Sequence, residues 1–374
     1  MEQVIYADNA ATTKLDIEAF DAMIPWLKDE YGNASQRYSF AKKPREAITK
    51  ARQIIASCIN AEPEEIFFTS GGTESDNWSI KTSMLNNNDY KAIITSAFEH
   101  HAILRSCTEI ERLGFPVIYL TPSSDGYILP EMLNNAISKP ARMVSIMFAN
   151  NEIGSIQPIK ELCKIAHSEG AIFHTDAVQA VGHIDINVKD LDVDMLSASA
   201  HKFNGPKGVG FLFVKKGTPI APYIHGGSQE HNMRAGTENI AAIVGMSIAL
   251  RNNIQQMNHN KSRIISLEKQ LIQKLQGVGI PFVRNGGNNT LPGLISLSFP
   301  NKDGEAILHR MDLKGICIST GAACNSKETE VSHVLKAIGI DSSYATGTIR
   351  ISLGKNNSED DVETIAKALI KCVC

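Results

Sequence analysis

Residues 92–120, with the sequence AIITSAFEHHAILRSCTEIERLGFPVIYL, indicate the fold class of the chain. The runs Ala92–Thr95 and Pro116–Leu120 are short, apolar and rich in β-branched residues, which predicts two strands. Between them, His101–Leu113 places apolar residues at helical spacing, which predicts a helix. Two strands joined by a helix are typical of a βαβ unit, in which the strands lie parallel.

The same alternation extends through the first two thirds of the chain. Further strands are predicted at Ile66–Phe68, Met143–Phe148, Ala171–Thr175, Met195–Ser197 and Val209–Val214, with a helix at Ile159–Ser168. We therefore expect an α/β fold with a mainly parallel sheet covered by helices. Polar clusters stand at four predicted strand ends, namely Glu99–His101, Asn150–Glu152, Asp176–Gln179 and Ser199–Lys202. Because such sheets bind ligands at the carboxyl ends of their strands, these clusters predict one shared site.

The character of the sequence changes after about residue 250. Residues 251–263 are mostly polar, and an amphipathic helix is predicted at Ile264–Leu275. Strands are predicted after it at Leu294–Phe299 and Thr348–Ser352, with helices at Glu305–Met311 and Val331–Ala337. We expect residues 15–257 to form a large domain, and residues 1–14 and 258–374 to form a smaller α+β domain.

Composition and charge exclude several classes of protein. The 374 residues are 43% hydrophobic and 21% charged, which is ordinary for a globular protein. The net charge is −3, so the chain lacks the excess of basic residues that would indicate nucleic acid as its main partner. The N-terminal sequence has no secretory signal pattern, and no apolar run is long enough to span a bilayer. We therefore expect a cytoplasmic protein. The seven cysteines form no CxxC pair, so neither a zinc site nor a disulfide framework is predicted.

Three features of the predicted site suit pyridoxal 5'-phosphate (PLP). Lys202, after a strand, can form a Schiff base with a carbonyl cofactor, although a single loop lysine is more often only solvated. Asp176 can pair with the pyridine nitrogen of PLP, although an aspartate here can equally cap a helix. The glycine-rich turn in Thr69–Asn77 can bind a phosphate, although many such turns bind nothing.

Several segments together resemble the class V PLP enzymes, and within that class the NifS-like cysteine desulfurases. They are Ala7–Thr13, Thr69–Ser75, Asn150–Gly154, His174–Gln179 and Ser199–Lys202. The resemblance extends from about residue 4 to about residue 365, and the stretch from Cys324 to Leu335 resembles the long-loop subgroup. It implies a fold type I PLP-dependent transferase, with the small domain carrying the active-site cysteine loop.

The resemblance also implies a role for each matching residue. Lys202 would hold PLP and act as a catalytic base, and His100 would stack on its ring and move protons. The remaining cofactor contacts would come from Asp176 at the ring nitrogen, Gln179 at the ring oxygen, and Gly72, Thr73, Ser199 and His201 at the phosphate. Thr237 would reach the phosphate of a neighbouring subunit, which implies a homodimer with shared sites. Asn151 and Arg350 would bind the carboxylate of the substrate, L-cysteine.

Cys324 lies among small and polar residues and, viewed alone, is most simply an incidental surface thiol. In the family, a motif of this shape carries the nucleophile, although Ala322 and Asn325 depart from the usual serine and threonine. The resemblance implies that L-cysteine becomes L-alanine and that Cys324 becomes a persulfide. The sulfur would then pass to an acceptor protein, for iron–sulfur cluster assembly or tRNA thiolation. No resident metal is expected, and a transient iron–sulfur contact at Cys324 stays open.

Three other activities remain open at this point. A selenocysteine lyase or a class V aminotransferase would share the PLP site, and an aminotransferase would not need Cys324. A PLP-fold protein that only binds partners is an alternative of another class. The presence of Lys202, Asp176, His100 and Cys324 together favours an enzyme. The sequence ends in Ala366–Cys374, AKALIKCVC, whereas relatives that dock an iron–sulfur scaffold have a longer tail, so the acceptor is left open.

Overall fold

The structure, a computed structural model, describes residues 4–85, 91–137, 140–320 and 331–374. The largest sheet of this part has seven strands in the order β2-β8-β7-β6-β5-β3-β4. They are β2 (Ile66–Thr69), β3 (Ala92–Ser96), β4 (Val117–Leu120), β5 (Ala141–Ser145), β6 (Ile172–Asp176), β7 (Met195–Ser199) and β8 (Gly210–Val214). Within this sheet, β8 runs opposite to the other six strands. The mainly parallel sheet expected from the sequence is therefore confirmed.

Helices cover both faces of this sheet. On β8, Phe211 and Phe213 pack into one apolar cluster and Leu212 into another, because successive side chains of a strand point to opposite faces. Helices α3 (Gly72–Leu85) and α4 (His101–Arg112) pack on the face with Leu212. The other face is packed by α2 (Lys42–Ile59), α5 (Pro130–Ala136), α6 (Ile159–Ser168) and part of α8 (Ile240–Gly277). The short helices α1 (Ile17–Lys28) and α7 (Val188–Leu191) complete this part.

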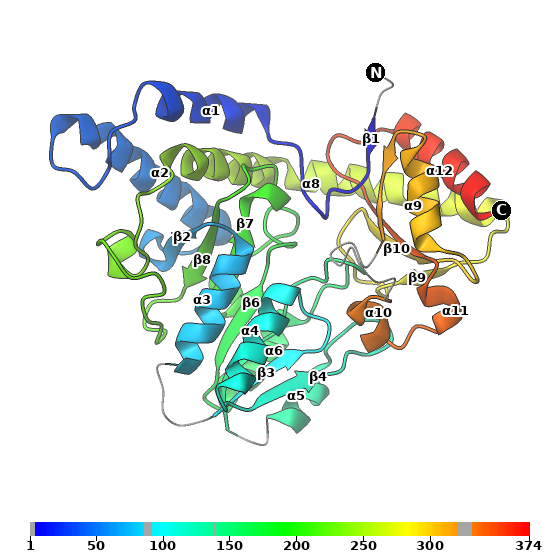
Figure 1. Cartoon of the computed structure of the whole chain (residues 1–374), viewed down its shortest axis with the longest axis horizontal. Coiled ribbons are helices and arrows are strands. Elements are labelled where there is room, and N and C mark those ends of the chain that lie inside the picture. The colour runs from blue at the N-terminus through cyan, green and yellow to red at the C-terminus, as the bar shows by residue number, and fades with distance from the viewer. Residues whose placement is uncertain (1–3, 86–90, 138–139, 321–330) are drawn as a thin grey trace.

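A second, antiparallel sheet forms the smaller part of the molecule. Its strands, in the order β12-β13-β10-β9, are β9 (Val283–Asn285), β10 (Leu294–Ser298), β12 (Ser319–Thr320) and β13 (Thr348–Ser352). Helices α9 (Gly304–Asp312) and α12 (Glu359–Val373) share its apolar cluster, and α10 (His333–Ala337) and α11 (Ser342–Ala345) are short. Strand β1 (Ile5–Tyr6) pairs in parallel with β11 (Ile316–Cys317), so the first strand of the chain belongs to this smaller part (Figure 1).

Helix α8 runs across the molecule from the large sheet to the small one (Figure 1). The sequence predicted a helix only over Ile264–Leu275, because residues 251–263 are mostly polar, and that start was wrong. Two asparagines inside this stretch are buried and hydrogen-bonded to other segments. Asn253 Nδ2 donates to the Phe203 carbonyl at 2.7 Å, and Asn252 Nδ2 donates to Glu18 Oε2 at 3.0 Å. These bonds satisfy the buried amides, so the polar stretch continues the helix.

The predicted division at residues 257 and 258 falls inside this continuous helix and stays a prediction. The first half of α8 packs on the large sheet through residues such as Leu250, and its second half packs on the small sheet through residues such as Leu271. Among the described residues, no helix combines the length and the apolar character that crossing a membrane requires.

Other element boundaries show which sequence signals were reliable. The helix predicted at Ile159–Ser168 coincides with α6. The strand predicted at Met143–Phe148 is shifted, because β5 begins at Ala141 and ends at Ser145. Ile146 and Phe148 are buried in the core without belonging to the strand. The apolar character of residues 146–148 therefore indicates burial and not pairing with a neighbouring strand.

We expect Gly210→Ala to destabilise the protein. A Cβ atom at Gly210 would lie 2.4 Å from the Ala198 carbonyl oxygen and 2.7 Å from Gly71 Cα, both backbone atoms. Forcing the strands apart should reduce the free energy of unfolding by about 1–3 kcal/mol, which a lower Tm in a calorimetric scan would detect. The matched control is Gly277→Ala, since a Cβ there meets no atom within 4 Å. Equal melting of Gly210→Ala and the unmodified protein would contradict this account of the strand packing.

Candidate active site

A cavity of about 660 Å³ lies where the carboxyl ends of the parallel strands meet the small sheet. Its size is in the range of small-molecule sites. Ten residues proposed from the sequence line it, namely Gly72, Thr73, His100, Asn151, Asp176, Gln179, Ser199, His201, Lys202 and Arg350. The structure therefore brings together residues that are spread over 279 positions of the chain, from 72 to 350. The shared site expected from the strand ends is present.

The turn between β2 and α3 forms one end of the cavity. Gly71 has a φ of +147°, and a Cβ on Gly72 would lie 2.4 Å from Val178 Cγ2, so both positions favour glycine. Helix α3 begins at Gly72, and the N–H groups of its first turn lack partners within the helix. These N–H groups, with the hydroxyls of Thr73 and Ser199 nearby, make this end suitable for an anion such as a phosphate.

Asp176 and Lys202 stand at the ends of neighbouring strands β6 and β7. Asp176 is 5% exposed, and its Oδ1 accepts the Val178 N–H at 2.9 Å. Burial raises the pKa of Asp176, whereas the hydrogen bond from Val178 and the charge of Lys202 lower it. Lys202 Nζ donates to the carbonyl oxygens of Ala10 and Ala11 at 2.6 and 2.9 Å. The N-terminal segment thus holds the lysine at the wall of the cavity.

His100 forms the N-cap of α4 and faces the cavity. Its Nδ1 accepts the Ala102 N–H at 3.1 Å, so in the neutral ring the proton lies on Nε2. Restricted hydration and the charges of Lys202 and His101 lower the pKa of His100, although Asp176 opposes them. The ring is therefore neutral at pH 7. Neighbouring His201 is also neutral, because burial lowers its pKa to about 4.

Arg350, on β13, is held by two acceptors. Its guanidinium donates to Asp8 Oδ1 and to the Asn151 carbonyl oxygen, each at 2.8 Å. Its Nε is buried and has no partner among the described residues. A guanidinium that is held by two acceptors and still has free N–H donors is suited to binding a carboxylate through two hydrogen bonds. Asn151 meets Arg350 through its backbone, which the sequence could not show.

Four acidic residues near the cavity received no role from the sequence. Asp8 pairs with Arg350, and Asp76 lies buried on α3. Burial raises the pKa of Glu99 to about 8, and that of Glu152, which accepts a hydrogen bond from Ser332, to about 7. Glu99 and Glu152 stand in the polar clusters at the strand ends, which was the available signal. Asp8 and Asp76 had no comparable indication in the sequence, where they merely belong to the segments Ala7–Thr13 and Thr69–Asn77.

One predicted residue, Thr237, does not line this cavity, and another, Cys324, is not described. Thr237 lines a smaller cavity of about 180 Å³, together with Ser70 and Arg234, on the other side of the turn that leads into α3. Cys324 lies outside the described residues, so its predicted role is not tested. Ser319 and Val331, the nearest described residues that line the large cavity, stand on either side of that segment.

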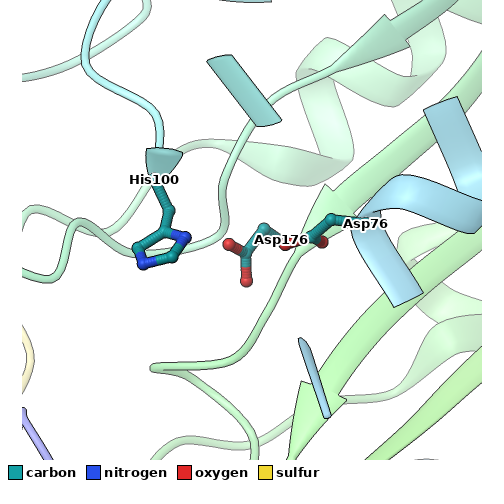
Figure 2. Close-up of side chains that lie close together, drawn as sticks. All are labelled: Asp76, His100 and Asp176. Carbon is teal, nitrogen blue, oxygen red and sulfur yellow. The ribbon is translucent and has the colours of Figure 1, made fainter. Parts of the chain in front are cut away.

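The residues of the large cavity fit PLP. The turn at Gly72 suits its phosphate, the buried Asp176 suits its ring nitrogen, and Lys202 offers an amine for its aldehyde. A metal ion is a weaker match. Figure 2 shows Asp76, His100 and Asp176 gathered together, with ligand atoms within 4.8 Å of one another. Burial raises the pKa of both aspartates, however, and a proton on either carboxyl would oppose a cation.

Comparisons with known proteins agree with this site. The family model for aminotransferase class-V matches residues 5–365. The cysteine desulfurase IscS of Dictyoglomus turgidum is 47% identical over 97% of this chain and 92% of its own length. That of Methanosarcina thermophila is 44% identical over 99% of this chain and 92% of its own length.

Solved structures show the same likeness. A NifS-like protein superposes with a TM-score of 0.93 at 36% identity and covers 99% of both chains. A structure described as SspA in complex with cysteine has a TM-score of 0.84 at 35% identity, covering 95% of this chain and 100% of the other. The chain therefore belongs to the class V aminotransferase family, among its NifS-like cysteine desulfurases, and PLP is its cofactor.

Proposed function

We propose that this chain converts L-cysteine to L-alanine with PLP and transfers the released sulfur to Cys324. The observation that carries the proposal is the convergence of Lys202, Asp176 and the Gly72 turn on one cavity, with Ser319 and Val331 in its wall. The similar curated relatives are named cysteine desulfurases, and a similar solved structure is described as a complex with cysteine.

The residues of the cavity would hold cofactor and substrate from three sides. PLP, when bound, withdraws electrons from the α-carbon of an attached amino acid and so favours loss of its α-proton. Asp176 would accept a hydrogen bond from the ring nitrogen, and Gln179 would contact the ring oxygen. The phosphate would be held by Gly72, Thr73, Ser199 and His201. Arg350, with Asn151 behind it, would bind the substrate carboxylate.

Two side chains would move protons. Lys202 Nζ is the base that would accept the α-proton of the substrate, after the substrate amine has displaced it. His100 would stack on the ring, and its Nε2–H lies in the same cavity. Because the pKa of His100 is lowered, the ring is neutral at pH 7. To act as an acid it would take up a proton at Nδ1 and then release the Nε2 proton into the cavity.

The sulfur step would belong to Cys324. Its thiolate would attack the substrate sulfur, forming a new S–S bond while the Cβ–S bond breaks and leaves its electron pair on carbon. Protonation of that carbon yields alanine, and Cys324 is left as a persulfide. A thiol on an acceptor protein would then take the outer sulfur. The acceptor would be an iron–sulfur scaffold or a tRNA-thiolation enzyme, in the cytoplasm, and an iron–sulfur contact at Cys324 would be transient.

A homodimer would complete the site. Thr237 lines a cavity apart from the PLP cavity of its own chain, so it would bind the phosphate in a partner subunit. Helix α1 exposes four large apolar side chains, Ile17, Phe20, Ile24 and Leu27, which a second copy of the chain would cover.

The variant Cys324→Ala tests the proposed function. It should keep the visible absorbance of bound PLP, because Cys324 takes no part in holding the cofactor. It should lose production of alanine and sulfide from L-cysteine in the presence of a thiol reductant, because no thiolate remains to accept the sulfur. Cys374→Ala is the control, since Cys374 is an exposed thiol far along the chain from the motif and should be dispensable.

Desulfuration by Cys324→Ala at the rate of the unmodified protein would exclude Cys324 as the acceptor. Conversion of a keto acid by the unmodified protein, without action on cysteine, would favour an aminotransferase instead.

The ion pair of Arg350 generates a second kinetic prediction. Asp8→Asn removes the charge that orients the guanidinium, so KM for L-cysteine should rise roughly tenfold, with a smaller effect on kcat. Asp16→Asn is the matched control, because Asp16 also forms an ion pair with a basic residue distant in sequence, Lys355, but does not line the PLP cavity. An unchanged KM in Asp8→Asn would show that Asp8 does not position Arg350.

Sedimentation equilibrium tests the proposed dimer. We expect the PLP-loaded protein to sediment with twice the mass of one chain, and replacement of both Phe20 and Ile24 by serine to weaken the association. A fully active monomer would contradict the role of Thr237 in a partner's site.

A further inference from the structure

Asp76 is a buried acid that no step proposed so far uses. It stands one turn into α3 and is 1% exposed, and its side chain lines the PLP cavity. In Figure 2 its carboxyl lies behind that of Asp176, on the side away from His100. Its Oδ1 is buried and has no hydrogen-bond partner among the described residues. A carboxylate in this position would lack the compensation that a buried charge requires.

Among the described residues, the groups around Asp76 are neutral or acidic. Its hydrogen-bond partner is the Ser197 hydroxyl, and His174 Nε2 lies 3.8 Å from Oδ1. His174 is fully buried between Ser145 and Ser197, and burial lowers its pKa to about 3, so it is neutral. The other titratable neighbours are the acids Asp176 and Glu99 and the neutral ring of His100, which has a nitrogen within 4.8 Å.

Asp176 differs from Asp76 in what faces it. The charge of Lys202 favours its ionised form, and the Val178 N–H donates to it. In the part of the chain that the structure describes, Asp76 has the Ser197 hydroxyl alone in that role, and burial and then the charge of Asp176 raise its pKa well above the ordinary range. Two like charges this close in a dry environment cannot both persist, so one proton stays on the pair. The asymmetry of the neighbours places that proton on Asp76.

We propose that Asp76 is a positioning residue that stays a neutral carboxylic acid behind Asp176, so that the pair carries one negative charge and directs it at the cofactor. This proposal rests on the proposed function in one respect, which is that Asp176 faces the ring nitrogen of PLP. Asp76 would act through Asp176 and would not touch the substrate. A second anion at this position would change the charge opposite the ring nitrogen.

Asp76→Asn and Asp76→Ala separate this role from a charged one and from a purely packing one. Asparagine reproduces the shape and neutrality of the protonated acid, so Asp76→Asn should bind PLP as the unmodified protein does. The pH midpoint of its visible absorbance should also be unchanged. Asp76→Ala removes the polar group beside Ser197 and should bind PLP roughly tenfold more weakly. Asp176→Asn, the contrasting variant, should alter the absorbance because it removes the charge itself.

The proton can also be observed directly. Infrared difference spectra of Asp76→Asn against the unmodified protein, at pH 7, should show loss of a protonated-carboxyl band. Ser79→Ala is the control for disturbance of α3, because Ser79 is fully buried on the same helix and its hydroxyl only bonds the Ser75 carbonyl. Ser79→Ala should retain the band and the affinity for PLP.

Loss of a carboxylate band in place of the protonated one would overturn the proposal. A shifted pH midpoint in Asp76→Asn, or full PLP affinity in Asp76→Ala, would do the same. If Asp76→Ala fails to fold, Asp76→Asn and the infrared measurement still decide the question. Failure of the proposed function would be a separate result, because the infrared band can be measured whether or not the protein binds PLP.

Discussion

The site depends on a single buried anion, the Asp176 carboxylate at the end of β6. Burying an isolated charge costs several kcal/mol unless opposite charges or hydrogen bonds compensate it. Here Lys202 lowers the pKa of Asp176 and the Val178 N–H donates to it, but burial still leaves that pKa raised. The compensation is therefore incomplete without a ligand. A protonated ring nitrogen would supply what is missing, which would link binding of PLP to the electrostatics of the cavity.

Local signals were sufficient for much of the fold and for the centre of the site. The helix α6 could be placed because its apolar residues repeat at the right spacing over ten positions. Lys202 and Asp176 could be placed because each follows an apolar strand, and parallel strands bring their carboxyl ends together. In each case the evidence lies within a few residues of the position concerned.

The remainder depended on partners distant in the sequence. The polar stretch in α8 was not recognised as helix because its buried asparagines bond to Phe203 and Glu18, about 50 and 230 positions away. Asp8 acquires a role only through Arg350, 342 positions away. The pairing of Asp76 with Asp176 likewise exists only after α3 packs on the sheet. Periodicity and motif spacing carry no information about such contacts.

The pairing of β1 with β11, and of Asp8 with Arg350, has a consequence for biosynthesis. A ribosome adds residues in order, at roughly 5–20 per second, and earlier segments can fold while later ones are still being made. Residues 5–8 cannot do so, because their partners at 316, 317 and 350 emerge near the end of translation. The carbonyls of Ala10 and Ala11, which accept hydrogen bonds from Lys202, belong to the same N-terminal segment. A nascent chain therefore has no finished cofactor cavity until almost its whole length has been synthesised, and a truncated product is unable to form one.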